Sequence, residues 1–347
     1  MNRPIRMGVS SCLLGHPVRY DGGHKLDSYV TDTLGRFFEF VPVCPEVECG
    51  LGVPRPAMRL AGDPKKPRLE VIDTGGDLTV RMKASCARRV EELAGKDLCG
   101  YIFKSKSPSC GMARIKVFRE NGPPSAAGVG LFARAFMDRF PFLPVEDEGR
   151  LHNPVLRENF IERVFTLRRF RNLLAEIGWH ETGTRDVAPK ALGGKARVSG
   201  LVAFHAAHRY LIASHSPKIA AEMGRLVAGA ASVPPGKLFP KYRELLLSAM
   251  ALRATPAKHV NVLRHILGYF KKRITPGEKA EALELFENYR AGLTPLIVPV
   301  TLLSHYVRTY DVASLKDQWY LRPHPRELML RNHASCRVLE KSVSFFE

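Results

Sequence analysis

The sequence lacks any long apolar run. No segment approaches the roughly 20 apolar residues that a membrane span needs, and the opening MNRPIRMG lacks the apolar core of a signal peptide. We therefore expect a cytoplasmic protein that does not bind a membrane. The sequence also contains no fixed-period repeat.

Closely paired cysteines are also missing. The chain has seven cysteines, an odd number, and no two of them form a CxxC pair. A disulfide framework is not expected in a long chain of this kind, which favours metal binding or catalysis. A structural zinc site is not indicated either, because it uses four protein ligands, usually with cysteines in close pairs.

Acidic residues are few relative to basic ones. The chain has 34 Asp and Glu against 53 Lys and Arg, a formal net charge of +19. The excess is uneven: residues 1–150 carry 23 basic and 18 acidic side chains, whereas residues 151–347 carry 30 and 16. A basic half of this kind attracts a polyanion such as nucleic acid, or keeps a surface soluble, and charge alone leaves both interpretations open.

The first part of the chain alternates strand and helix signals. The expected strands are 5–9, 38–43, 100–103 and 115–118, and the expected helices are 27–38, 83–94 and 130–139. Residues 69–73 and 78–82, on either side of Gly75-Gly76, have the pattern of a β-hairpin. The alternation predicts an α/β domain with three layers and a mostly parallel, Rossmann-like sheet.

The second part of the chain has a different sequence pattern, with helical periodicity and few strand signals. Residues 141–154 mix prolines with acidic residues and mark a boundary, which gives an expected first domain of 1–143 and a second of 155–347. Apolar periodicity of 3.6 residues follows over 155–177, 201–214, 219–230, 241–252, 258–273, 279–293 and 298–310. We predict an all-α domain, with a loop at 182–199 and a surface-lying tail from His324.

Three cysteines each come just after a predicted strand. Cys12 follows the first strand in SSCLLG, Cys44 follows the second in VCPEVECG, and Cys110 follows the third in KSKSPSCG. The carboxyl ends of parallel strands meet at one edge of a sheet, where such folds bind ligands, so we expect one shared site. Three thiolates without a fourth would leave a metal position open, although Cys49 remains a possible fourth ligand.

These motifs carry a resemblance to a known family. SSCLLGHPVRYDGGHK, VCPEVECGLGVPRP and KSKSPSCG resemble the thiouracil desulfidase (TudS) family over about residues 5–140. In the second half, LVAFHAAHRYLIASHSP, KHVNVLRHILGYFKK and YLRPHPRELMLRN are similar to a known companion domain. The two together look like the bacterial tRNA 4-thiouridine desulfidases of the RudS type.

The resemblance implies a [4Fe-4S] cluster on Cys12, Cys44 and Cys110, with an iron free to take the sulfur of a thiocarbonyl. It also maps the catalytic residues onto Glu46 and Ser107. Many members have a second cysteine where Val18 stands here, but that cysteine is not thought to hold the cluster. The alternative roles are local: Glu46 could cap the 50–55 loop, and Ser107 could bond its own turn.

Other polar residues are weaker candidates for contacts to the substrate. Arg19, Tyr20 and Asp21 in the first loop could recognise a pyrimidine, with Tyr20 as a stacking face. Lys104 and Lys106 could balance cluster charge or contact a phosphate, or be solvated loop lysines.

The predicted helical domain combines basic and aromatic residues, which suits folded RNA. The basic candidates are Arg168, Arg169, Arg171, Lys271, Lys272 and Arg273, and the aromatic ones are Phe170, Tyr210, Tyr269 and Phe270. Ordinary burial in a bundle is the alternative for each aromatic. His205 and His208 have i, i+3 spacing that a metal site could use, but buried polar networks or phosphate contacts fit them better.

Our first hypothesis is therefore a cluster-dependent desulfidase acting on 4-thiouridine in tRNA. The second keeps the chemistry but takes free thiouracil or thiolated nucleosides as substrate. The third is a non-catalytic iron–sulfur protein that binds RNA or senses redox state. The sequence leaves open the preferred tRNA, the acceptance of 2-thiouridine, the role of Cys49 and the oligomeric state.

Overall fold

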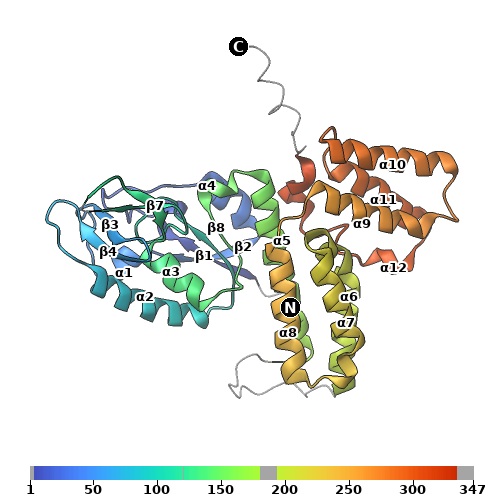
Figure 1. Cartoon of the computed structure of the whole chain (residues 1–347), viewed down its shortest axis with the longest axis horizontal. Helices are drawn as coiled ribbons and strands as arrows, with labels where there is room; N and C mark the ends of the chain where they lie inside the picture. The colour runs from blue at the N-terminus through green and yellow to red at the C-terminus, as the bar shows by residue number, and fades with distance from the viewer. Residues whose placement is uncertain (1–3, 120, 180–193, 334–347) are drawn as a thin grey trace, which may run out of the picture. The chain divides into compact units, whose positions relative to one another are not determined.

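The computed structural model describes residues 4–119, 121–179 and 194–333, and its contacts divide the chain into two units, Met1–Leu156 and Arg157–Glu347 (Figure 1). None of the helices among these residues is both long and apolar enough to cross a bilayer.

The first unit is α/β. Its strands are β1 (Ile5–Ser10), β2 (Phe38–Val43), β3 (Met58–Asp63), β4 (Lys66–Val71), β5 (Leu98–Phe103), β6 (Ile115–Phe118), β7 (Ser125–Gly128) and β8 (Val145–Asp147). Its helices are α1 (Pro45–Glu48), α2 (Thr79–Ala94), α3 (Leu131–Arg139) and α4 (Glu148–Leu151). The main sheet has the order β2-β1-β5-β8 and is entirely parallel. This sheet and the helical second unit confirm the predicted fold class.

Aromatic packing ties the central strand to a helix. Successive side chains of a strand point to opposite faces, so Tyr101 and Phe103, which are two positions apart, lie on the same face of β5. They contact Phe132 and Phe136 of α3, with ring centroids 4.7 to 6.2 Å apart. This cluster anchors β5, whose carboxyl end carries the KSKSPSCG loop.

A second sheet was not expected from the sequence. It has the order β4-β3-β6-β7, with β3 and β4 antiparallel. The hairpin predicted around Gly75-Gly76 is confirmed only in part: Glu70 and Asp77 form an antiparallel bridge across this turn, but residues from Thr79 onward form α2 instead of a second strand. The second strand is absent because the side chain of Thr79 receives a hydrogen bond from the Leu69 backbone at 2.8 Å, while Asp77 accepts one from the Thr79 backbone at 2.7 Å, so this turn starts a helix.

Two other segments differ from their predicted form. The helix expected over 27–38 is present as a π-helix at Tyr29–Thr33 followed directly by a 3₁₀-helix at Leu34–Arg36, without an α-helix. Within 141–154, expected to link the domains, β8 pairs with β5 and α4 follows it directly. A strand of three residues has too short a pattern to be recognised beside prolines.

The second unit consists of helices. They are α5 (Pro154–Glu176), which begins in the first unit, α6 (Gly194–His215), α7 (Pro217–Ala228), α8 (Pro235–Ala251), α9 (Pro256–Leu267), α10 (Pro276–Ala291), α11 (Ile297–Thr309) and α12 (Ala313–Lys316). Part of the loop predicted over 182–199 lies outside the described residues, and the rest already belongs to α6.

A buried ionic network crosses the core of this unit. Arg331, which is 3% exposed, donates to Glu162 at 2.9 Å and to the Tyr320 carbonyl at 2.6 Å. Glu162 also pairs with His215 at 3.0 Å. The expectation that the tail from His324 lies on the surface is therefore wrong for Arg331. Charge alone did not reveal a buried arginine whose partner lies 169 positions earlier in the chain.

Several proposed RNA contacts are also internal. Arg168 is 5% exposed, and Phe170 and Phe270 are fully buried. Arg169 donates to the Nε2 atom of His208 at 2.9 Å and to the Pro323 carbonyl at 2.8 Å, so it joins helices to the tail. Among the basic candidates, Lys271, Lys272 and Arg273 are exposed.

The buried histidines predict how stability depends on pH. Burial lowers the pKa of His259 to about 3, from an ordinary value near 6.5. Below about pH 6.5 the unfolded chain therefore binds a proton at His259 that the folded chain does not bind. The free energy of unfolding consequently decreases as the pH falls. Glutamine has no such proton to bind. The difference in the free energy of unfolding between His259→Gln and the unmodified chain should therefore shift by about 2 kcal/mol in favour of the variant from pH 7.5 to pH 5.

Urea unfolding at the two pH values, followed by helical circular dichroism, measures this difference. The control is His265→Gln, because His265 is exposed and the same substitution there removes no buried imidazole. An effect of His259→Gln that is the same at both pH values would contradict the prediction.

Candidate active site

The carboxyl ends of the main-sheet strands surround one cavity of about 450 Å³ in the first unit. The register places Ser10 beside Val43 and Val9 beside Ile102, so the loops after β1, β2 and β5 start side by side. The predicted site residues that line the cavity are Cys12, Cys44, Cys110, Glu46, Ser107, Arg19, Tyr20, Lys104 and Lys106. The structure thus brings together residues from three loops that are far apart in the sequence.

Asp21 does not line this cavity. It turns back to Arg19, which donates to its two carboxylate oxygens at 3.3 Å, and it accepts from the Gly23 backbone at 3.1 Å. These bonds lower the pKa of Asp21, with the Arg19 contact as the largest cause. Asp21 therefore shapes the first loop, while the Arg19 guanidinium lies 5.3 Å from the centre of the Tyr20 ring.

The three cavity thiols are partly or fully shielded from solvent. Burial raises the pKa of Cys12 to about 11, partly offset by the nearby ammonium of Lys104. Burial also raises the pKa of Cys110 well above the ordinary thiol range; Glu46 adds to the rise, and a hydrogen bond from Ser10 opposes it. The thiols lie close enough to interact electrostatically, because Cys44 raises the pKa of both Cys12 and Cys110.

Cys49 is not part of the cavity lining. Its thiol donates to the Glu46 carbonyl at 3.2 Å on the inner side of α1, and it adds to the raised pKa of Cys86. Cys336 lies outside the described residues. Within the part of the chain that the structure describes, the cavity therefore has three cysteines and no fourth.

The donor set suits a group with several metal atoms. Among residues 4–119, 121–179 and 194–333, no three Cys, His, Asp or Glu side chains come close enough to hold a single metal ion. Three thiols spread around a cavity can each bind a separate iron of a cluster. The Ser10 side chain lies near the Cys110 sulfur and lowers its pKa, and polar groups beside the sulfurs tune iron–sulfur sites.

Glu46 stands at the first turn of α1, directly after Cys44 and Pro45. Its Oε2 accepts from the Nε of Arg55 at 3.0 Å and pairs with the Nη2 of the same guanidinium. Both side chains are shielded, 14% and 5% exposed. Arg55 also donates to the carbonyl of Val18 at 2.9 Å, so it fixes Glu46 against the first loop. Both Arg55 contacts use Oε2, and Oε1 is the oxygen left for a substrate or water.

Ser107 organises the turn that carries Cys110. Its Oγ accepts from the backbone of Ser109 at 3.2 Å and of Cys110 at 3.0 Å. The local role considered for Ser107 is thus present, and the hydroxyl proton is still available for a further bond. Gly111 is required because a Cβ there would meet Ile115 at 2.1 Å and the Ser107 carbonyl at 2.8 Å. The packing of the turn therefore excludes a side chain at this position.

Lys104 is held by a residue that the sequence did not suggest. Its ammonium pairs with Glu148, the first residue after β8, and Glu148 also accepts from the Ser105 backbone at 2.7 Å. Lys104 is therefore a fixed charge near Cys12, not a solvated lysine. Lys106 is exposed at the rim of the cavity.

Arg55, Glu148 and Ser10 are the residues that the sequence analysis missed. The motif GVPRP did contain Arg55, and the 50–55 loop was considered as a partner of Glu46. Glu148 follows β8, the strand hidden among prolines, and nothing in the sequence pointed to its pairing with Lys104.

Comparison with known proteins shows what each unit is similar to. Residues 7–148 match the family model described as 2-thiouracil desulfurase, and residues 209–325 match a protein family of unknown function, DUF1722. The solved structure of the [4Fe-4S]-dependent thiouracil desulfidase TudS is 32% identical and covers 43% of this chain and 93% of that one, with a TM-score of 0.36. The Uncharacterized protein YbgA of Escherichia coli (strain K12) is 29% identical over 133 residues, 38% of this chain and 79% of that protein. Over residues 7–148, the first unit is thus similar to the 2-thiouracil desulfurase family.

Proposed function

We propose that this chain is a [4Fe-4S]-dependent desulfidase that converts 4-thiouridine in tRNA to uridine, in the cytoplasm. Water supplies the oxygen that replaces sulfur, and the sulfur leaves as sulfide, so no net oxidation or reduction is needed. The observation that carries the proposal is the cavity at the strand ends, where Cys12, Cys44 and Cys110 meet without a fourth described cysteine.

These three cysteines would hold the cluster through their thiolates. When bound, the cluster supplies an iron with an open position, a soft Lewis acid suited to the sulfur of a thiocarbonyl. Lys104 lies near Cys12 and would offset part of the negative charge of the site. Ser10 lies near the Cys110 sulfur and would donate a hydrogen bond to it.

Glu46 is the proposed general base. A carboxylate at the cavity wall can accept the proton of a water that attacks the thiolated ring carbon, and later return it as the sulfur departs. Arg55 holds one carboxylate oxygen and so sets the direction of the other. Ser107 has its lone pairs occupied by two backbone groups, which directs its O–H proton towards a partner in the cavity. We assign it the orientation of the pyrimidine or of the attacking water.

The proposal of tRNA as substrate is supported by charge and by the second unit. Residues 151–347 carry 30 basic against 16 acidic side chains, an excess that favours a polyanion. Reaching a base inside folded RNA requires unstacking it at a cost of a few kcal/mol, which phosphate contacts can offset. Free thiouracil is the second candidate, favoured by the description of the matched family.

The test is anaerobic reconstitution of the full chain with iron and sulfide, followed by incubation with thiolated tRNA and nucleoside analysis. We expect 4-thiouridine to be replaced by uridine, with sulfide released in equal amount. Free 2-thiouracil and free 4-thiouridine are assayed in parallel. Consumption of the free compounds with unchanged tRNA would favour the second candidate, and no conversion of any of them would contradict desulfidase activity.

A further inference from the structure

The second unit displays an aromatic ring that is held rigidly but left open to solvent. Trp319 is 37% exposed, and the guanidinium carbon of Arg169 lies 4.2 Å from the centre of its ring. Arg169 is itself fixed by His208 and by the Pro323 carbonyl. The imidazole of His208 is also stacked against the indole, with ring centroids 5.8 Å apart. The part of Trp319 that these two groups leave exposed can contact another flat group.

A second exposed ring lies beside an arginine. Tyr269, 40% exposed, accepts a hydrogen bond from the Nη2 of Arg209 at 2.5 Å. The same atom donates to the Tyr210 hydroxyl at 3.0 Å, and the guanidinium carbon lies 4.5 Å from the centre of the Tyr210 ring. The guanidinium is thus held between two tyrosines, so these three side chains already have this arrangement without a bound partner.

The two features are neighbours along α6. The Trp319 backbone donates to the Ala207 carbonyl at 3.0 Å, and the adjacent Gln318 donates to the Ala206 carbonyl at 2.9 Å. Ala206 precedes Tyr210 by four residues, so the two occupy the same side of the helix one turn apart. The segment carrying Trp319 therefore lies next to Arg209 and Tyr210.

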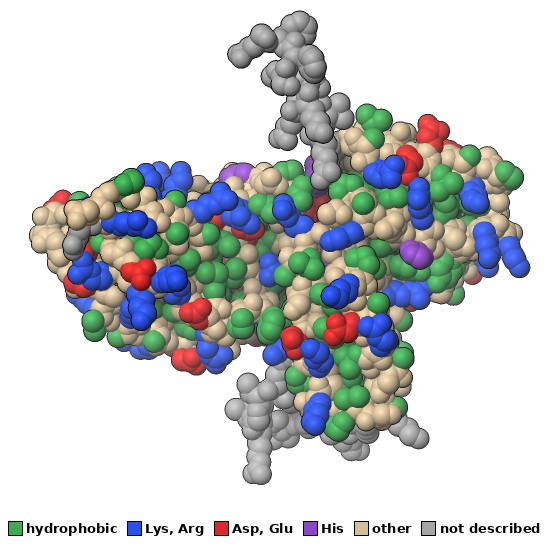
Figure 2. All heavy atoms as spheres, in the orientation of Figure 1, with side chains coloured by type: hydrophobic (Ala, Val, Ile, Leu, Met, Phe, Trp, Pro, Cys, Tyr) green, Lys and Arg blue, Asp and Glu red, His purple; other side chains and the backbone are tan. Residues whose placement is uncertain are grey.

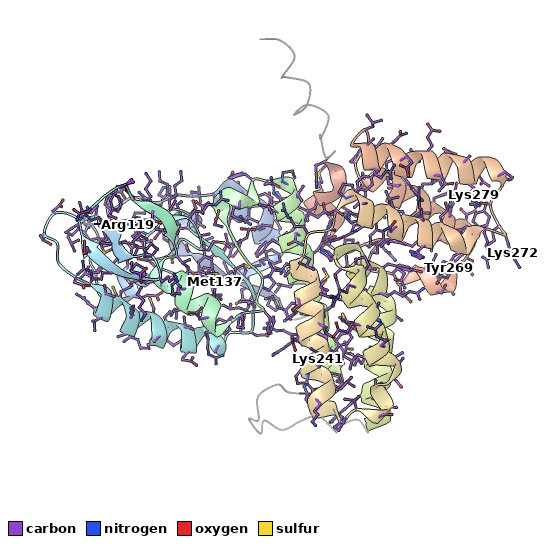
Figure 3. The ribbon with its side chains drawn as sticks, viewed as in Figure 1. Arg119, Met137, Lys241, Tyr269, Lys272 and Lys279 are labelled. Carbon is purple, nitrogen blue, oxygen red and sulfur yellow. The ribbon has the colours of Figure 1, made fainter. Side chains whose placement is uncertain are left out.

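Basic side chains surround these rings. Lys271 and Lys272 are exposed on the connection between α9 and α10, two and three residues after Tyr269. Figure 2 shows Lys and Arg side chains gathered at that edge of the unit, and Figure 3 labels Tyr269 and Lys272 there. Arg322 donates to the Lys316 carbonyl at 3.1 Å on the Trp319 side. The acids nearby include Asp311, which is paired with Lys316, and Asp317.

We propose that Trp319, Arg209, Tyr210, Tyr269, Lys272 and Arg322 form a stacking face for unpaired bases of the substrate RNA. The inference rests on the proposed function. Aromatic rings and guanidinium planes stack on bases, while lysines neutralise the adjoining phosphates. Trp, Tyr and Arg are also common at protein–protein interfaces, but lysine is depleted there, so the exposed Lys271 and Lys272 beside Tyr269 favour a polyanion. The chemistry therefore fits a loop or a single-stranded end of RNA.

Intrinsic fluorescence tests the stacking directly, because the chain has two tryptophans. The full-length, cluster-loaded Trp179→Phe variant leaves Trp319 as the emitter. We expect an unmodified tRNA transcript to quench it, while heparin, a polyanion without bases, does not. The matched control is Trp319→Phe, which retains Trp179 and should not be quenched. Unchanged Trp319 emission with tRNA, or equal quenching by heparin, would overturn the proposal.

A kinetic experiment separates this face from the catalytic cavity. In the Arg209→Gln/Tyr269→Leu variant, the KM for thiolated tRNA should rise about fivefold or more, while the rate on free 4-thiouridine stays unchanged. Lys241→Gln, at an exposed lysine of α8 labelled in Figure 3, is the control. An unchanged KM for tRNA would overturn the stacking face. Quenching by tRNA without any desulfuration of it would instead contradict the proposed function and leave the stacking face supported.

Discussion

Replacing Cys110 by alanine should remove the iron from the reconstituted protein and bring desulfuration below detection. Cys110 is 6% exposed, in a turn that Ser107 holds by two backbone hydrogen bonds. Because clusters are bound by thiolates, and the cavity offers three described cysteines, losing one leaves no spare ligand. Iron and acid-labile sulfide per chain, together with visible absorbance, measure the loss. Cys12→Ala and Cys44→Ala should behave in the same way.

Two other cysteines provide the controls for this prediction. Cys49, the residue after α1, and Cys86 of α2 are both buried, and neither lines the cavity. Cys49→Ala and Cys86→Ala should keep the iron content of the unmodified chain, although each loses some packing. The assignment of ligands would be contradicted if Cys110→Ala retained full iron, or if Cys49→Ala lost it. The second result would make Cys49 the fourth ligand that the sequence left open.

The convergence of the cysteines was predictable because it follows from topology. Cys12, Cys44 and Cys110 each come soon after a strand of the same parallel sheet, and parallel strands place their carboxyl ends along one edge. Local sequence patterns identified β1, β2 and β5, and the sheet brought their ends together.

The surroundings of the cysteines were not predictable in the same way. Arg55 and Glu148 reach the site through side-chain pairing across nine and 44 positions, and no periodic pattern records such a pairing. Arg331 illustrates the same limit in the second unit, since its charge suggested a surface position and its burial depends on Glu162. Non-local ion pairs are visible only when coordinates place both partners.

The second large effect is expected at Glu46. The Glu46→Gln variant should bind iron normally but turn over about 10²- to 10⁴-fold more slowly, which is the usual contribution of a general base. Glutamine keeps the shape of the side chain and an oxygen that can accept from Arg55, so the first loop should remain in place. Rates measured under saturating substrate, beside iron content, separate the proton-transfer role from a role in cluster binding.

Glu48→Gln is the matched control, because Glu48 belongs to the same short helix but does not line the cavity. Its Oε1 accepts from the Cys44 backbone at 3.2 Å, a bond that the glutamine oxygen can replace. We expect this variant to retain its rate within a few-fold. If Glu46→Gln also kept its rate, the carboxylate would serve only to anchor Arg55, and the attack of water would need another base.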